Sequence, residues 1–383
     1  MEWSSHARLR VCLGMVIALL AGRSTAETGV SQTEVLLGQS APFSGPAAEV
    51  GRDFLAGAQT YFAQINARGG VHGRRVRLLS LDDRYEPERA LANIQQLVWR
   101  DKVFALFGVS GTPTLLASMP AIKESGIPLF APLSGAQAFR QPFNRQIFHI
   151  RASYAQETDF LLRQLQSTGR LKVAVFYQND ELGKSMLDTL RQRALIYGLT
   201  LVGSVAIERN SVAVQEPAEA LLKVKPDVVI LVVSYQPAAA LITRMREGGY
   251  LGGFSNYSFV GSVSLAARIR QGGAGVEITQ VVPFPNRARL PIVYEYQKAV
   301  AHTPGAACNF VGLEGYIAAR ALTEGLRRAG RSLTREGLIR ALETITPDNY
   351  DGGGFFLHFQ RGNHNGSDFV DLTAIGRGGR FLN

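Results

Sequence analysis

Short apolar runs alternate along the chain with longer segments in which apolar residues recur every three or four positions. Within residues 51–67, for example, Phe54, Ala58 and Tyr61 mark one face of a predicted helix. In the first part of the chain, the apolar runs predict strands at residues 35–40, 76–81, 103–107, 127–131 and 146–150. Strands that alternate with amphipathic helices are typical of a parallel sheet covered by helices.

The same alternation starts again after residue 150. The predicted helices are residues 156–168, 182–197, a segment ending at 223, 238–247, 291–301, 313–328 and 334–343; the strands are 173–177, 201–207, 228–233, a segment near 258, and 276–282. The glycine-rich tail, 352–381, predicts short strands and turns. With 383 residues and no fixed-period repeat, the sequence predicts an α/β protein of two similar lobes.

The N-terminus has the pattern of an export signal. Arg8 and Arg10 precede an apolar run over residues 11–21, and small residues follow up to Ala26. We expect residues 1–26 to be a signal peptide cleaved near Ala26, and the mature protein to be periplasmic. No later stretch reaches the roughly 18 apolar residues that a membrane helix requires.

Charge and cysteine content exclude some classes of function. Loss of residues 1–26 removes three arginines and one glutamate, which lowers the formal net charge from +10 to +8. The remaining basic residues are scattered, so we expect a solvated surface and no nucleic-acid partner. Only Cys308 lies beyond residue 26, which leaves neither an internal disulfide nor a cysteine-built metal site.

Motifs of catalysis and of cofactor binding are missing. The sequence contains no HExxH, GxSxG, GxxxxGK[ST] or GxGxxG, so no cofactor is expected, and His358 and His364 lack the spacing of paired metal ligands on a helix. An enzyme that uses Asp82, Asp83 or His149 in a cleft remains an alternative. Turn or helix-capping roles are more common for such aspartates.

Two turns after predicted strands are candidates for ligand binding. They consist of Ser110, Gly111 and Thr112, and of Ser134, Gly135 and Ala136. Thr112 is predicted to cap the next helix, with Pro113 as its first residue. The free amides and positive dipole end of a helix N-terminus suit a carboxylate or another anion.

Several segments together resemble the leucine/isoleucine/valine-type periplasmic binding proteins. The residues that carry the resemblance are Pro42-Phe43-Ser44-Gly45-Pro46, Gly51, Gly57-Ala58, Ile65-Asn66, Gly69-Gly70-Val71, Gly73, Asp82-Asp83, Phe107-Gly108 and Gly126-Ile127-Pro128. The similarity continues to Gly376–Phe381 and so spans nearly all of the chain after residue 26.

The resemblance implies a type I periplasmic binding fold, in which two Rossmann-like lobes are joined by a three-segment hinge. It places the crossovers near residues 151–153, 281–284 and 347–353, which gives an N-terminal lobe of 27–151 plus 283–350 and a C-terminal lobe of 152–282 plus 351–383. The cleft would close on an amino acid or related small carboxylate, and the loaded protein, expected to be a monomer, would engage an inner-membrane ABC permease.

The resemblance also maps the two turns above onto the carboxylate and ammonium sites of the family, and Tyr235 onto a cleft tyrosine. The sequence departs from the family at three positions, where Val50 and Leu182 replace aromatics and Ser258 or Phe259 stands near the ammonium-binding glutamate. Glu314 or Asp180 is then the candidate to supply the missing carboxylate for a ligand ammonium group. Smaller side chains at Val50 and Leu182 suggest a wider or reshaped pocket that binds an aromatic or other organic acid.

A second class of function is compatible with the same fold, namely a ligand-sensing regulator that binds amides or amino acids without transport. No predicted membrane helix or DNA-binding segment supports a receptor or a repressor.

Overall fold

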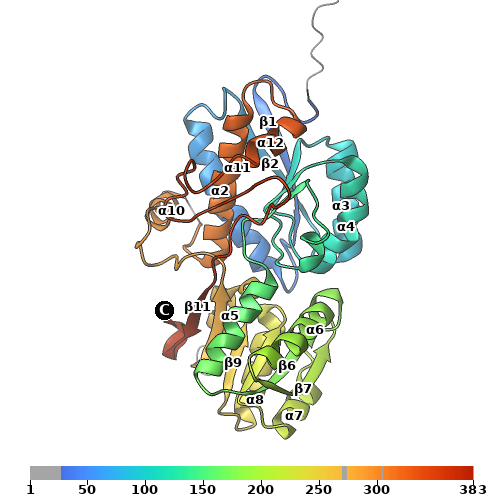
Figure 1. Cartoon of the computed structure of the whole chain (residues 1–383), viewed down its shortest axis with the longest axis vertical. Coiled ribbons are helices and arrows are strands. Elements are labelled where there is room, and N and C mark those ends of the chain that lie inside the picture. The colour runs from blue at the N-terminus through green and yellow to red at the C-terminus, as the bar shows by residue number, and fades with distance from the viewer. Residues whose placement is uncertain (1–26, 270–273, 304, 383) are drawn as a thin grey trace, which may run out of the picture.

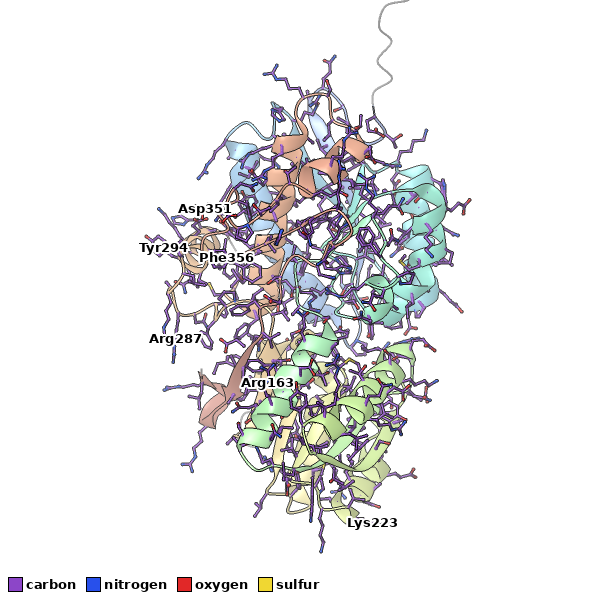
Figure 2. All side chains as sticks on the ribbon, in the orientation of Figure 1. Arg163, Lys223, Arg287, Tyr294, Asp351 and Phe356 are labelled. Carbon is purple, nitrogen blue, oxygen red and sulfur yellow. The ribbon has the colours of Figure 1, made fainter. Side chains whose placement is uncertain are left out.

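The computed structural model describes residues 27–269, 274–303 and 305–382, which form two α/β lobes that lie one above the other along the long axis of the molecule (Figure 1). The predicted signal peptide lies outside the described residues. Charged side chains such as Arg163 and Lys223 project from the outer helices into solvent (Figure 2).

The N-terminal lobe contains a parallel sheet of strand order β2-β1-β3-β4-β5. Its strands are β1 (Glu34–Ala41), β2 (Arg75–Asp82), β3 (Ala105–Phe107), β4 (Leu129–Phe130) and β5 (Ile147–Phe148). Its helices are α2 (Ala48–Ala67), α3 (Pro87–Gln95), α4 (Thr112–Ser125), α10 (Pro291–Ala301), α11 (Phe310–Ala329) and α12 (Arg335–Leu342).

The C-terminal lobe contains a sheet of order β12-β11-β10-β9-β8-β6-β7, in which β11 runs antiparallel to β10. Its strands are β6 (Lys172–Gln178), β7 (Thr200–Ile207), β8 (Val228–Val232), β9 (Gly253–Asn256), β10 (Val276–Gln280), β11 (Asp371–Ile375) and β12 (Phe381–Leu382). Its helices are α5 (Tyr154–Ser167), α6 (Glu181–Ile196), α7 (Gln215–Lys223), α8 (Tyr235–Glu247) and α9 (Ser262–Arg268). These two lobes confirm the predicted fold class.

Burial follows from the sequence in both lobes. All five residues of β8, Val-Val-Ile-Leu-Val, are fully buried, as expected of a central parallel strand that helices cover on both faces. In the other lobe, α2 and α11 pack closely at glycines, where a Cβ on Gly57 would lie 1.8 Å from the carbonyl oxygen of Gly312. The core therefore requires glycine at this helix contact.

The third crossover comes later in the chain than the predicted residues 347–353. The segment 351–366 packs on the N-terminal lobe, where the Phe359 ring lies 5.3 Å from that of Phe148 and Asn365 pairs with His149. The chain enters the other lobe only after Ser367, before β11. The error arose because irregular glycine-rich chain carries no periodicity that assigns it to a lobe. The other two crossovers are residues 149–153 and 281–290.

Candidate functional site

A narrow cavity of about 30 Å³ lies between the lobes at the carboxyl ends of their strands. Both lobes and the start of α5 line it, through Pro42, Ala47, Val50, Tyr85, Ser110, Gly111, Thr112, Leu133, Tyr154, Leu182, Ser234 and Phe259. A cavity needs roughly 10–15 Å³ of such space to hold one water molecule, so this one is too small for an organic solute. The lobes must therefore separate to admit an organic solute.

The turn between β3 and α4 forms the polar wall of the cavity. Gly111 has φ of 93°, and a Cβ there would lie 2.5 Å from Cε2 of Tyr85, so only glycine fits. Gly111, and not Thr112, occupies the N-cap position, which corrects the capping prediction. The Thr112 hydroxyl instead lies 2.8 Å from Oγ of Ser134 and remains at the cavity.

The second predicted turn lies outside the cavity lining but contacts Thr112, which lines it. Ser134, Gly135 and Ala136 do not line the cavity, although the preceding residue, Leu133, does. Ser134 is fully buried, and its Oγ also accepts a hydrogen bond of 3.3 Å from the Ala136 amide. Its place next to Thr112 makes it a positioning residue for that hydroxyl.

Val50 and Leu182, from opposite lobes, both line the cavity, but its volume of about 30 Å³ is not that of a widened pocket. Three aromatic residues, Tyr85, Tyr154 and Phe259, line the cavity with them. Sequence reasoning missed Tyr85, Tyr154 and Ser234, and it named Phe259 only as a position near the missing glutamate. Two of them had a signal, since Tyr85 follows the carboxyl end of β2 and Ser234 immediately precedes Tyr235.

Tyr235 lies at the rim of the cleft and not in its lining. Its ring is 1% exposed and lies under the guanidinium of Arg268, whose Cζ is 4.6 Å from the ring centroid. Burial, together with the nearby Glu49 carboxylate, raises the pKa of Tyr235 to about 12. Because Glu49 belongs to α2 of the opposite lobe, Tyr235 contributes to contact between the lobes.

Ser258 and Glu314 belong to a buried polar network that links the hinge with both lobes. Arg151, 1% exposed, lies 3.1 Å through Nε from Oε1 of Glu314 on α11 and donates from Nη2 to Ser258 Oγ at 2.8 Å. Ser258 in turn donates through Oγ and its amide to Glu157, each at 2.9 Å. Neither Ser258 nor Glu314 lines the cavity.

Both candidate replacements for the family glutamate, Glu314 and Asp180, already have partners within the protein. Burial opposes the charge on Arg151, but Glu314 and Glu157 outweigh it, so the pKa of Arg151 is raised. Burial raises the pKa of Glu314, and Arg151 acts against that shift. Asp180, the other candidate, caps α6 by accepting from the amides of Leu182 and Gly183.

The residues of the enzyme alternative have structural roles. Asp82 accepts hydrogen bonds from the amides of Phe43 and Ser44 and so holds the β1–α2 loop. His149 is 2% exposed and contacts the carbonyl of Phe139 at 3.2 Å through Nε2, and burial lowers its pKa. Neither lines the cavity.

Asp83→Asn is expected to flatten the pH dependence of stability. Burial raises the pKa of Asp83 to about 7, although hydrogen bonds from the Tyr85 amide and the Ser40 hydroxyl oppose this. The unfolded chain has an ordinary aspartate pKa of about 3.9. Between these values the folded state holds the proton more tightly, so stability is greatest below about pH 4 for this group and falls as pH rises through about 7.

Urea unfolding at about pH 5 and about pH 8 measures this effect. The native protein should lose more stability between the two values than the asparagine variant does. Asp188→Asn, a change on the exposed face of α6, is the matched control. An identical pH dependence in the native protein and Asp83→Asn would contradict the assignment.

Two ion pairs join the lobes across the mouth of the cavity. Glu86 lies 3.0 Å from Nη2 of Arg209 and also accepts from Asn210 at 2.9 Å. On the other side, Glu49 lies 3.6 Å from Arg268. Because these contacts exist only when the lobes are together, they stabilise the closed form.

Glu86→Gln is expected to weaken the affinity for a cleft ligand by up to about fivefold, since partly exposed pairs contribute roughly 0.2–1 kcal/mol. The dependence of Kd on salt should also become shallower, because screening acts on the charge that has been removed. Calorimetry at low and high salt measures both effects, with Glu295→Gln, within the N-terminal lobe, as control. An unchanged Kd at low salt would show that the Glu86–Arg209 ion pair does not stabilise the closed form.

Two hinged α/β lobes with a neutral, hydroxyl-lined cavity between their strand ends define the class of solute-binding proteins that close around a ligand. A family model described as periplasmic binding protein matches residues 34–379. The chain therefore belongs to the periplasmic binding protein family, and the predicted resemblance is confirmed.

Individual relatives agree with this family. A Leu/Ile/Val-binding protein homolog 7 from Brucella melitensis is 24% identical, with 91% of this chain and 90% of the relative covered. The crystal structure of a possible leucine/isoleucine/valine-binding protein from Rhodopirellula baltica has a TM-score of 0.85 and 29% identity, and covers 92% of this chain and 96% of its own. An ABC-transporter solute-binding protein of R. palustris, in complex with benzoate, has a TM-score of 0.81 at 18% identity and covers 91% and 95%.

This membership makes the protein a periplasmic substrate-binding protein and confirms the prediction of a binding protein over an enzyme. Among the described residues, none of the helices combines the length and apolar character needed to cross a membrane.

Proposed function

We propose that this protein captures a small organic acid with an apolar body and no α-ammonium group, and delivers it to an inner-membrane ABC permease. The observation that carries this proposal is the neutral lining of the cavity. Its described lining residues include no acidic or basic side chain, but they include the hydroxyl groups of Tyr85, Ser110, Thr112, Tyr154 and Ser234.

The carboxylate would be held at the polar wall. The first turn of α4 has amides without intrahelical acceptors, and the positive end of its dipole faces the cavity next to Ser110 and Thr112. Ser234, at the N-terminus of α8, approaches from the other lobe and makes no capping hydrogen bond of its own. Neutral donors of this kind favour an anion.

An α-ammonium would have no counter-charge in this site. Glu314 is paired with Arg151, Asp180 caps α6, and Glu49 faces Arg268. Burial of a cation without a partner costs several kcal/mol. The apolar part of the lining, which includes Val50, Leu133 and Phe259, suits a hydrocarbon or aromatic body. The benzoate bound to the R. palustris protein is a ligand of this chemistry.

The experiment compares ligands that differ only in the α-ammonium group. Thermal shift and calorimetry are run with 3-phenylpropionate against L-phenylalanine, with 4-methylpentanoate against L-leucine, and with benzoate. We expect one or more of the acids to bind, and its amino-acid counterpart to bind at least about 100-fold more weakly, which corresponds to about 2.7 kcal/mol. Tighter binding of leucine than of 4-methylpentanoate would overturn the proposal.

Delivery to a permease is tested separately. The loaded protein should raise the ATPase rate of its partner ABC transporter reconstituted in liposomes, and the ligand-free protein should raise it less. Light scattering should give the mass of a monomer. If no transporter responds, the sensing alternative takes precedence over transport.

A further inference from the structure

A second cavity, of about 530 Å³, lies behind the hinge. Ser153 and Gln156 at the start of α5 and Ser367 and Asp368 in the third crossover line it, together with residues of the segment after β4 and of the tail. It shares no lining residue with the cavity between the lobes. Tyr154 faces one cavity and its neighbour Ser153 the other, so the two cavities lie on opposite sides of the first crossover.

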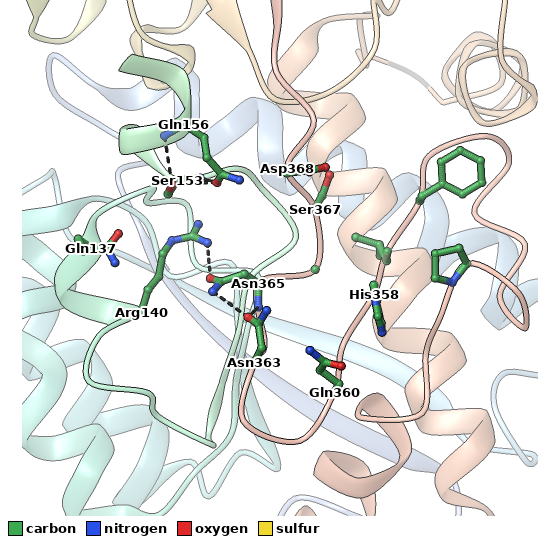
Figure 3. Close-up of a pocket in the computed structure, with 14 residues that line it drawn as sticks. Gln137, Arg140, Ser153, Gln156, His358, Gln360, Asn363, Asn365, Ser367 and Asp368 are labelled. Atoms are coloured by element: carbon green, nitrogen blue, oxygen red, sulfur yellow. Dashed lines mark hydrogen bonds between the residues drawn. The ribbon is translucent and has the colours of Figure 1, made fainter. Parts of the chain in front are cut away.

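Arg140 is the one arginine among the residues that line this second cavity. It is 6% exposed and donates from Nη1 to Oδ1 of Asn365 at 2.5 Å, and from Nη2 to the carbonyls of Arg151 and Ala152 at 3.0 and 3.4 Å. Figure 3 shows the guanidinium reaching toward Asn365, with Asn363 beside it and Asp368 across the cavity. These partners tie Arg140 to the hinge but are all neutral.

Arg140 has no carboxylate within ion-pair distance among the described residues, and its buried Nε has no hydrogen-bond partner. Glu157 attracts its charge only from beyond that distance. Burial and the like charge of Arg151 lower the pKa of Arg140 to about 9. A buried cation without a counter-ion is costly, and an anion placed beside it would remove that cost.

The rest of the lining suits a small anion. Gln137, Gln156, Gln360 and Asn363 offer neutral amide donors around the guanidinium. Asp368 is the one carboxylate among the lining residues, and it is exposed. Because its charge opposes that of an anion, it gives the site a residue whose neutralisation should strengthen binding.

We propose that this hinge cavity is a second ligand site, which binds a small oxyanion, a carboxylate or a phosphate-type ion, against Arg140. The site is independent of the proposed organic-acid site between the lobes. The proposal stands on the cavity, on the buried guanidinium whose Nε has no hydrogen-bond partner, and on the amide lining.

The test is calorimetry of the purified protein with sodium acetate and with sodium phosphate, at constant ionic strength set with chloride. Two nearly isosteric variants change the charge of the site. Asn363→Asp keeps the oxygen that accepts from the amide and side chain of Asn365, at 3.0 and 2.9 Å, and places a negative charge close to Arg140. Asp368→Asn removes the opposing charge.

We expect saturable binding of one anion, a loss of at least tenfold in affinity in Asn363→Asp, and a gain in Asp368→Asn. Asp188→Asn on the outer face of α6 should leave the affinity unchanged. Saturation by acetate alone identifies a carboxylate site, and saturation by phosphate identifies a phosphate-type site. Absence of saturable binding, or equal affinity in the native protein and Asn363→Asp, would overturn the proposal.

Discussion

Replacement of Arg151 by methionine is expected to lower the free energy of unfolding by about 3–5 kcal/mol, since it leaves a buried carboxylate without its partner. Glu314 is 3% exposed and pairs with Arg151 at 3.1 Å, and Ser258 loses a donor at the same time. Urea unfolding near neutral pH measures the effect. It should be one of the largest of any single substitution, because the network joins the hinge to both lobes.

A double variant separates two costs of the Arg151 substitution: loss of the attraction between Arg151 and Glu314, and burial of the Glu314 carboxylate without a partner. Arg151→Met combined with Glu314→Gln should recover part of the stability, because the remaining side chain is neutral. Arg77→Met serves as control, since Arg77 is 54% exposed beside the partly exposed Glu34 and its replacement should cost less than about 1 kcal/mol. Equal destabilisation by Arg77→Met and Arg151→Met would show that the cost does not come from burial of the Arg151–Glu314 pair.

Thr112→Val is expected to raise the Kd for the carboxylate ligand about 10- to 100-fold. The variant keeps the shape of the side chain but removes the hydroxyl, and a hydrogen bond to a charged group contributes roughly 1.5–3 kcal/mol. Because the cavity has no cationic lining residue, each neutral donor carries a large share of the binding. Calorimetry with whichever acid binds best measures the change.

The matched control is Thr60→Val. Thr60 is buried on α2 ten residues beyond Val50, about 15 Å along the helix, and its hydroxyl bonds only to the Ala56 carbonyl. It should leave Kd unchanged. Ser134→Ala should have a smaller effect than Thr112→Val, because Ser134 acts on the ligand only by positioning Thr112. Full affinity in a well-folded Thr112→Val would place the carboxylate elsewhere.

Most strands and helices could be predicted from the sequence because they depend on local patterns of apolar residues. The strand of Val228–Val232 and the face of α2 marked by Phe54 and Ala58 are visible as apolar runs and as helical period. The turn at Ser110–Thr112 was visible too, since small residues there follow a strand and precede a helix. The tail before Ser367 was misplaced because its position depends on contacts with Phe148 and His149, far away in sequence.

The sequence by itself determined two α/β lobes, the family, and one polar wall of the cleft, because periodicity, turn chemistry and motif spacing are local properties. Only the tertiary structure decided which charged side chains pair with one another and which can face a ligand. Arg151 and Glu314 are 163 residues apart in the chain, yet their pairing removes Glu314 from the ligand site. It also buried Arg140 with its Nε unpartnered and brought Tyr85, Tyr154 and Phe259 to the lining of the cavity. Such pairings depend on distances between elements, which no local pattern encodes.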